Sequence, residues 1–272
     1  MKAVARWKSL GWRHPVWDLL RFYLSLRGVN KSNEWLTDLR KDKVLSVDDG
    51  TTSFPVDPTH IKRFVEYLDH RDKVYKGATD LLRSEEEALA YCKAKVIEVT
   101  KTTTKSLEHH QSSKAMVATV STIGEKVCQQ FGYDIEPNPQ TRCVWCFGKG
   151  LHVTARNVDG AIPSLANPII IWEIKEYWGK TAGGSKMSDA VYECNLVGRE
   201  LREFEERTGF PVVHVVFVDG KEQWSYRKSD LYRFIDLLNQ GIIDQLFIGK
   251  EVETHWEPAL SEMLANAKTA KQ

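Results

Sequence analysis

The stretch from residue 167 to residue 179, NPIIIWEIKEYWG, is the feature that most restricts the fold of this chain. Three isoleucines and a tryptophan in a row are typical of a strand inside a buried sheet, because both faces of such a strand meet apolar layers. Residues two apart on a strand share a face, so Glu173 and Lys175 are expected side by side, away from the flanking apolar side chains. The pattern predicts a core strand that carries an acid and a base together on one face.

Length and composition set broad limits. The 272 residues, 42% of them hydrophobic, suffice for one large domain or two modest ones with a buried core. Lys and Arg number 38 against 37 Asp and Glu, so any contact with nucleic acid must come from a local patch and not from the net charge of +1. The apolar runs fall short of the roughly 18 to 20 residues of a membrane helix, and no secretion signal is recognisable. We expect a soluble, cytoplasmic protein.

The five cysteines are odd in number and irregularly spaced, which favours a reducing compartment over a disulfide framework. Cys143 and Cys146 form a C-x-x-C pair that is followed by His152. A structural zinc ion takes four ligands, and no second pair at matching spacing is present. Free core thiols are the preferred interpretation, with a zinc site as the alternative.

Residues 1–110 are predicted to be mainly helical. Asp57 and Pro58 offer an N-cap and a first-turn proline to an amphipathic helix, and Ser84 with Glu87 forms a capping box before another helix. The turn-rich stretch 47–58 is expected to be a loop.

Residues 111–272 show a mixed pattern. A helix from about residue 115 is expected to end near Gly132, and strands and helices then alternate in the order three strands, helix, strand, helix. The segments with the clearest patterns are a strand over 151–158, a helix over 189–207, a strand over 210–220 and a helix over 229–241. This order predicts an α/β core with a central mixed β-sheet flanked by helices, preceded by an N-terminal helical region.

The turn PSLANP predicts a hairpin centred near Ala166, in which the numbers of paired residues sum to about 332. Asp159 then lies opposite Glu173. Directly opposed side chains of an antiparallel pair have Cβ atoms roughly 5 Å apart, which is destabilising for two carboxylates unless a positive charge lies between them. Mg²⁺ prefers oxygen ligands of this kind, so the pair is a candidate cation site.

Asp159, followed after thirteen residues by Glu173-Ile174-Lys175, resembles the D…(D/E)-x-K motif of the PD-(D/E)xK nuclease superfamily. The order of elements from about residue 115 to 248 is similar to the αβββαβα core of that superfamily, so the resemblance covers about half of the chain. Val158 stands before Asp159 where the family pattern has proline. The size, with a helical region in front, is similar to type II restriction endonucleases.

The resemblance implies a set of roles. Asp159, Glu173 and the backbone carbonyl of Ile174 would bind Mg²⁺, or Mn²⁺ in its place, and Lys175 would orient or help deprotonate the water that attacks a DNA phosphodiester. Glu125, on the preceding helix, is a further candidate metal ligand, with a solvated position as its alternative. For Glu173 and Lys175 the alternative is a solvent-facing ion pair.

Other polar residues near the motif have less specific expectations. Lys180, Ser185 and Lys186 lie in a glycine-rich stretch and are candidate DNA contacts, with a plain connecting loop as the alternative. A Walker A motif is excluded, because it needs a glycine at position 174, where this chain has isoleucine. Glu176, by strand alternation, and Glu193, on the following helix, are expected to be structural or surface residues.

The N-terminus carries a basic cluster interleaved with tryptophans: Lys2, Arg6, Trp7, Lys8, Trp12 and Arg13. It is a candidate phosphate-backbone arm, and a role of the tryptophans in dimerisation or core packing is equally compatible. Residues 1–110 are therefore assigned to DNA contact, dimerisation or both.

The leading hypothesis is a Mg²⁺-dependent type II restriction endonuclease that cuts double-stranded DNA as a homodimer on a near-palindromic site. One alternative is a structure-specific, repair or defence nuclease of the same fold. Another is a non-enzymatic nucleic-acid-binding module with zinc in the C-x-x-C region.

Overall fold

The computed structural model describes residues 1–26, 28–47, 51–101, 112–179 and 184–269. Its centre is a four-stranded sheet in the order β5 (Gly160–Ile162), β6 (Ile170–Glu176), β7 (Val213–Asp219) and β8 (Gln245–Ile248). β5 runs antiparallel to β6, whereas β6, β7 and β8 are parallel to one another. The predicted mixed α/β sheet is confirmed.

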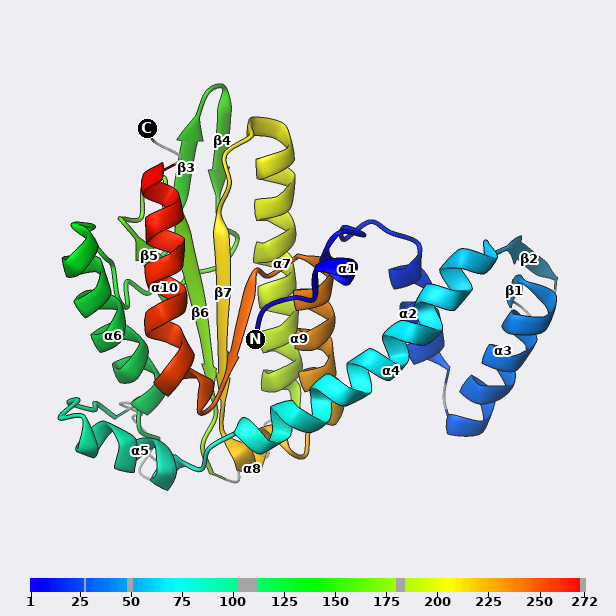
Figure 1. Cartoon of the computed structure of the whole chain (residues 1–272), viewed down its shortest axis with the longest axis horizontal. Helices are drawn as coiled ribbons and strands as arrows, with labels where there is room; N and C mark the ends of the chain where they lie inside the picture. Colours follow the sequence, from blue (N-terminus) through cyan, green and yellow to red (C-terminus); the bar gives the residue numbers. More distant parts are fainter. Residues whose placement is uncertain (27, 48–50, 102–111, 180–183, 270–272) are drawn as a thin grey trace.

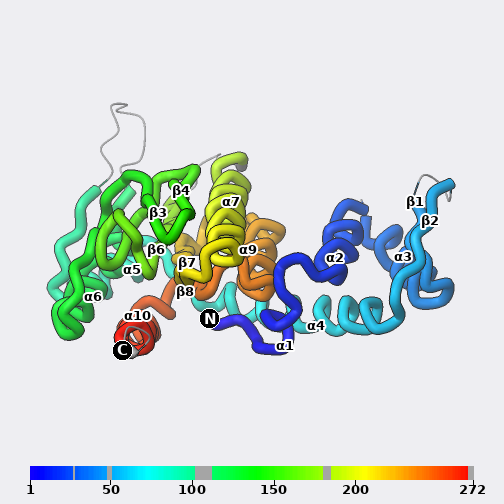
Figure 2. The backbone as a smooth tube through the Cα atoms, turned by 90° about the horizontal axis from the view of Figure 1, so that it is seen from above, coloured from blue at the N-terminus to red at the C-terminus, as the bar shows by residue number. Residues whose placement is uncertain are grey.

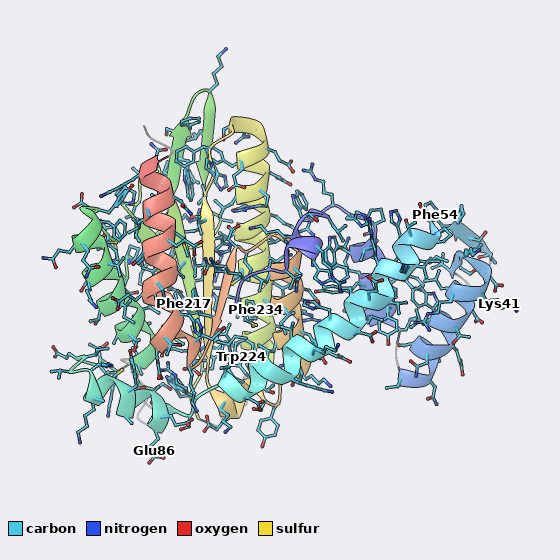
Figure 3. The ribbon with its side chains drawn as sticks, viewed as in Figure 1. Lys41, Phe54, Glu86, Phe217, Trp224 and Phe234 are labelled. Atoms are coloured by element: carbon cyan, nitrogen blue, oxygen red, sulfur yellow. The ribbon has the colours of Figure 1, made fainter. Side chains whose placement is uncertain are left out.

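Helices cover both faces of the sheet (Figures 1 and 2). The helices around the sheet are α6 (Ala115–Phe131) and α10 (Glu251–Thr269) on one face, and α7 (Gly184–Thr208) and α9 (Lys228–Gln240) on the other. Each face has its own apolar cluster: Phe217 of β7 lies in the cluster with α6 and α10, and Phe234 of α9 lies in the cluster with α7 (Figure 3). The sheet is therefore the middle layer of three.

Strand β6 has the predicted alternation. Trp172 and Ile174 belong to the apolar cluster with α6 and α10. Glu173 and Lys175 face the other layer, where Lys175 donates a hydrogen bond to Glu193 of α7. A buried strand between two helical layers thus keeps both its apolar core contacts and one charged face.

The predicted register of β5 against β6 is also confirmed. Gly160 pairs with Trp172 and Ile162 with Ile170, so that the partner numbers sum to 332. A Cβ at Gly160 would lie 1.7 Å from the Trp172 ring, so only glycine permits this close approach. The pairing brings the residue before β5, Asp159, next to the end of β6.

The predicted strand over 151–158 is wrong in its second half. Only β4 (Gly150–Val153) forms, and it pairs with β3 (Val144–Phe147) in a hairpin of its own. The chain leaves this hairpin at Thr154, whose hydroxyl accepts a hydrogen bond from the Cys143 N–H group at 3.1 Å. Instead of one continuous strand, the chain forms β4, which pairs with β3, and then β5, which pairs with β6. The helix predicted from residue 189 also begins earlier, at Gly184.

The N-terminal residues form a helical lobe beside the core (Figure 1). Its helices are α1 (Ala5–Lys8), α2 (Val16–Ser25), α3 (Val29–Asp42) and the long α4 (Pro58–Leu81), which runs from the lobe to the core. The stretch predicted as a loop contains a strand, β2 (Thr52–Pro55), which pairs with β1 (Val44–Val47) at the far end of the lobe, near the labelled Phe54 (Figure 3).

Local capping explains where two helices begin. The Asp57 carboxylate accepts a hydrogen bond from the Thr59 N–H group at the start of α4, and Ser84 with Glu87 forms the predicted capping box of α5 (Glu85–Ala94). Helix α5 packs against α6, and the short α8 (Lys221–Trp224) precedes α9. Among the described residues, no helix combines the length and apolar character needed to cross a membrane.

Candidate active site

Asp159 is hydrogen-bonded to strand β6 at the E-x-K sequence. Its Oδ2 atom accepts a hydrogen bond from the Ile174 N–H group at 2.8 Å, and its Oδ1 atom accepts one from Gln140 Nε2 at 2.9 Å. Its own N–H group donates to the Trp172 carbonyl at 3.0 Å. Burial raises the pKa of Asp159, while the Ile174 bond and the charge of Lys175 act in the opposite direction.

Glu173 is a buried carboxylate with a separate partner for each oxygen. The residue is 1% exposed, with Oε2 2.9 Å from Lys175 Nζ and Oε1 3.2 Å from His214 Nε2. Burial acts to raise its pKa, but Lys175 and His214 together outweigh burial and lower the pKa to about 2. Glu173 is therefore an ionised group inside the protein.

Lys175 lies between two carboxylates. Its ammonium contacts Glu173 and also donates to Glu193 Oε2 at 3.1 Å, and the residue is only 8% exposed. Burial acts to lower its pKa, but Glu173 more than compensates, so the pKa lies well above its ordinary value. The alternative of a solvent-facing ion pair is wrong, because both partners are buried.

Glu193 joins the site from helix α7, where a structural or surface role was expected. Besides accepting from Lys175, it accepts a hydrogen bond from Arg156 in the segment between β4 and β5. It therefore connects the buried lysine to an exposed arginine.

Glu176 points away from Lys175, as predicted. Its Oε2 atom accepts hydrogen bonds from the Met116 N–H group at 2.9 Å, at the start of α6, and from Trp178 Nε1 at 3.2 Å. Burial raises its pKa to about 7. Its contacts give it a structural role at the helix terminus.

A polar cavity of about 450 Å³ opens beside these groups. Its lining consists of Gln140, Arg142, Ala155, Arg156, Asn157, Asp159, Lys175 and Glu193. Arg142 is exposed and has no ion pair within the part of the chain that the structure describes. The cavity thus combines carboxylates with a lysine and two arginines, which suits a phosphate group.

Oxygen donors of the kind that a hard divalent cation takes lie in and beside this cavity: Asp159 is part of its lining, whereas Glu173 is buried and does not line it. Within a strand, the N–H and C=O groups of one residue point to the same side, so the Ile174 carbonyl is directed toward Asp159, as its N–H group is. Asp159, Glu173 and this carbonyl offer oxygen atoms only, the kind of ligand that Mg²⁺ prefers, although the Glu173 oxygens contact Lys175 and His214 in this structure. Among the described residues, no group of three or more His, Cys, Asp or Glu side chains could hold a metal ion, so the backbone would have to contribute.

Some predicted residues do not join the site. Glu125 is exposed on α6, which packs on the opposite face of the sheet from Glu173. Lys180 lies outside the described residues. Ser185 and Lys186 are exposed at the start of α7, where the Lys186 ammonium is 5.1 Å from the centre of the Tyr177 ring.

The basic N-terminal cluster is occupied by internal ion pairs. The pairs are Lys2 with Glu262, Arg6 with Glu66, Lys8 with Asp244 and Arg13 with Glu206. Trp7 is 2% exposed in the core of the lobe, so packing explains this tryptophan. An arm that bound DNA would first have to give up these ion pairs.

The cysteine pair has the properties of structural residues. Burial raises the pKa of the Cys143 thiol to about 12, whereas Cys146 is exposed on β3. The His152 ring stacks on Trp145, with 5.5 Å between ring centres. A neutral, buried thiol is a poor metal ligand, because zinc binds the thiolate.

Sequence reasoning missed His214, Gln140, Arg142 and Arg156. His214 left a signal, since it is the one polar side chain in the apolar run 210–218. Gln140 and Arg142 lie in an irregular segment, where no periodicity indicates the direction of a side chain, and Arg156 lies in the part of 151–158 that was predicted as a strand and is not one.

Among the comparisons with known proteins, one family model matches the part of the chain that contains the site. No curated protein and no solved structure matches the chain. The model of a domain of unknown function, DUF7687, matches residues 83–263, which is more than half of the chain and runs from the start of α5 into α10. All the residues around the polar cavity lie within this match, and the chain therefore belongs to the DUF7687 family.

Proposed function

We propose that the protein is a Mg²⁺-dependent DNA endonuclease with a PD-(D/E)xK core, and that Asp159, Glu173 and Lys175 carry the reaction. The observation that carries this proposal is the 2.8 Å hydrogen bond from the Ile174 N–H group to Asp159 Oδ2. It ties Asp159, directly before β5, to the middle of the E-x-K sequence of β6. A phosphodiester substrate is supported by Arg142 and Arg156, which line the cavity beside Asp159 and Glu193.

Each group has a chemical role in hydrolysis. Mg²⁺ bound by Asp159, Glu173 and the Ile174 carbonyl would supply Lewis acidity toward the phosphoryl group and lower the pKa of water. Lys175 is held as a cation and would orient the attacking water and offset negative charge that develops on the phosphoryl oxygens. Attack in line breaks the bond from phosphorus to the 3′ oxygen and leaves a 5′-phosphate.

The proposal extends to the type of nuclease. A type II restriction enzyme that acts as a homodimer on a near-palindromic site is the favoured type, because the helical lobe in front of the core is similar to that of such enzymes. Discrete fragments from phage or plasmid DNA would support sequence specificity, whereas a smear would favour a repair or defence nuclease of the same fold.

Cleavage of unmethylated genomic and plasmid DNA with and without Mg²⁺ tests the activity. We expect the wild-type protein to cut, and Asp159→Asn and Lys175→Ala to reduce the rate by at least a hundredfold. Glu125→Gln is the matched control, because it removes an exposed acid on the other face of the sheet. Melting curves of each variant show whether the fold is kept.

The proposal is overturned if the wild-type protein cuts none of these DNAs in Mg²⁺ or Mn²⁺. It is also overturned if folded Asp159→Asn and Lys175→Ala cut as fast as the wild type.

A further inference from the structure

A second cavity, of about 360 Å³, lies on the other side of helix α7, between that helix, α2 and α9. We call it the α2–α7 groove. Its charged and aromatic lining residues are Trp17 and Arg21 of α2, Tyr192 and Arg199 of α7, and Arg233 and Asp236 of α9. Three arginines thus meet at the junction of the N-terminal lobe and the core.

The single carboxylate of the lining is already neutralised. Asp236 accepts two hydrogen bonds from Arg71 of α4, at 2.7 and 2.8 Å, and a third from Tyr67 at 2.8 Å. Both partners of this ion pair are buried, at 5% and 6% exposed. Asp236 therefore leaves the positive charge of the groove uncompensated.

The arginines outnumber their acidic partners. Arg233 shares one carboxylate, Asp230, with Arg227, at 2.9 and 2.7 Å, so these two arginines carry one excess charge. Arg199 is within ion-pair distance of no carboxylate in the described part of the chain. Arg21 is paired with Asp18. The groove is therefore cationic overall.

Two contacts hold the Arg199 side chain in place. Its Nε atom donates to Asn195 Oδ1 at 3.1 Å, and its guanidinium lies 5.0 Å from the centre of the Trp12 ring. Burial and then the charge of Arg21 lower the pKa of Arg199, while Glu203 and Asp18 act in the opposite direction. A guanidinium with planar donors, crowded by another cation, gains from an anion with matching oxygens.

The groove and the candidate active site are neighbours across one helix. Tyr192 lines the groove and the next residue, Glu193, lines the polar cavity. Tyr192 is 57% exposed on the surface of α7. A helix with its side chains is about 10 to 12 Å across, which corresponds to roughly three base pairs of duplex at 3.4 Å per phosphate on one strand.

We propose that the α2–α7 groove binds the phosphodiester backbone of duplex DNA a few base pairs from the bond that is cut. This inference rests on the proposed function and assigns the N-terminal lobe a part in it. One duplex would lie across α7, with phosphates at Arg142 and Arg156 on one side and at Arg199 and Arg233 on the other. The lobe then contributes Arg21 to the same surface.

Binding measured without cleavage tests the groove. Fluorescence anisotropy of a labelled 30-base-pair duplex in EDTA compares the wild type with Arg199→Ala, Arg233→Ala and the double variant. We expect each single variant to weaken binding roughly tenfold, as for a lost charged hydrogen bond, and to lower the slope of log affinity against log salt by about 1. Arg199→Lys, which keeps the charge, should recover part of the affinity.

Lys126→Ala is the control, because Lys126 is an exposed cation on α6, across the sheet from α7. It should bind DNA as the wild type does, and melting curves verify that the groove variants are folded. If the wild type binds the duplex and the folded groove variants bind equally well, the groove assignment is overturned and the nuclease proposal stands. If the wild type neither binds nor cuts DNA, the proposed function and the groove assignment both fail.

Discussion

Glu173 on β6 and His214 on β7 are in contact inside the sheet, with Oε1 and Nε2 3.2 Å apart. The parallel register pairs His214 with Ile171, so the imidazole reaches diagonally to the residue two positions further along β6. Because Lys175 takes the other oxygen, His214 fixes the orientation of the Glu173 carboxylate. A residue outside the E-x-K sequence therefore sets the geometry of its acid.

We expect His214→Leu to raise the Mg²⁺ concentration that gives half-maximal cleavage by about 10- to 100-fold. The reason is that partners which orient a metal ligand commonly affect metal affinity on this scale. Cleavage rates over a Mg²⁺ titration measure the effect, and His214→Gln should recover part of it, because an amide can still contact Glu173. An unchanged Mg²⁺ dependence in a folded His214→Leu variant would remove His214 from the site.

Arg142→Ala should weaken productive DNA binding without destabilising the protein. Arg142 lines the polar cavity, is exposed and has no ion pair in the described part of the chain, so its removal breaks no internal contact. We expect kcat/KM for cleavage to fall about 10- to 100-fold, equivalent to roughly 1.5 to 3 kcal/mol for a lost charged hydrogen bond. Steady-state kinetics and a thermal melt check this, and a large drop in melting temperature would contradict it.

The alternation and pairing around the E-x-K sequence were predictable because both follow from local geometry. A period of two puts Glu173 and Lys175 on one face, and the turn at PSLANP sets the register that brings Asp159 to β6. Helix ends at Asp57 and Gly132 were predictable for the same reason, since capping depends on neighbouring residues.

Contacts between distant segments were not predictable. His214 reaches Glu173 only through the register of two parallel strands that helix α7 separates in the sequence. Arg142 and Gln140 reach the cavity from an irregular segment. The strand predicted over 151–158 was wrong because the chain changes partner at Thr154, and a polar and apolar alternation does not show which strand is the partner.

The stability of the core should depend strongly on a buried ion pair between Arg83 and Asp219. Both side chains are fully buried, and Arg83 Nε donates to Asp219 Oδ2 at 2.7 Å while a second donor reaches Glu253 at 2.7 Å. Asp219→Ala would leave the guanidinium without its main partner, so we expect the free energy of unfolding to fall by about 3 to 5 kcal/mol.

Urea unfolding of Asp219→Ala and of a surface control measures this difference. Glu257→Gln is the control, because it breaks the exposed pair with Lys126 and should cost at most about 1 kcal/mol. Equal losses in the two variants would show that Arg83 finds sufficient compensation elsewhere.

Stability should also fall in mild acid because of His152. Its ring stacks between Trp145 and Phe204, at 5.5 and 5.7 Å, and its Nε2 atom is buried without a hydrogen-bond partner among the described residues. Burial lowers the pKa of His152 below its ordinary value of 6.5, against the weaker opposing effect of Glu200. The folded protein therefore binds the proton less readily than the unfolded chain, and the stability present above pH 6.5 is lost as the pH falls toward the lower, folded-state pKa.

His152→Phe should reduce this loss, since phenylalanine keeps the ring stacking and cannot be protonated. We expect the fall in melting temperature between pH 8 and pH 5.5 to be smaller in His152→Phe than in the wild type. His255→Phe is the control, because His255 is exposed on α10 and its replacement should leave the pH dependence as it is. If His152→Phe loses as much stability in acid as the wild type, protonation at the β3–β4 hairpin does not limit the stability of the fold.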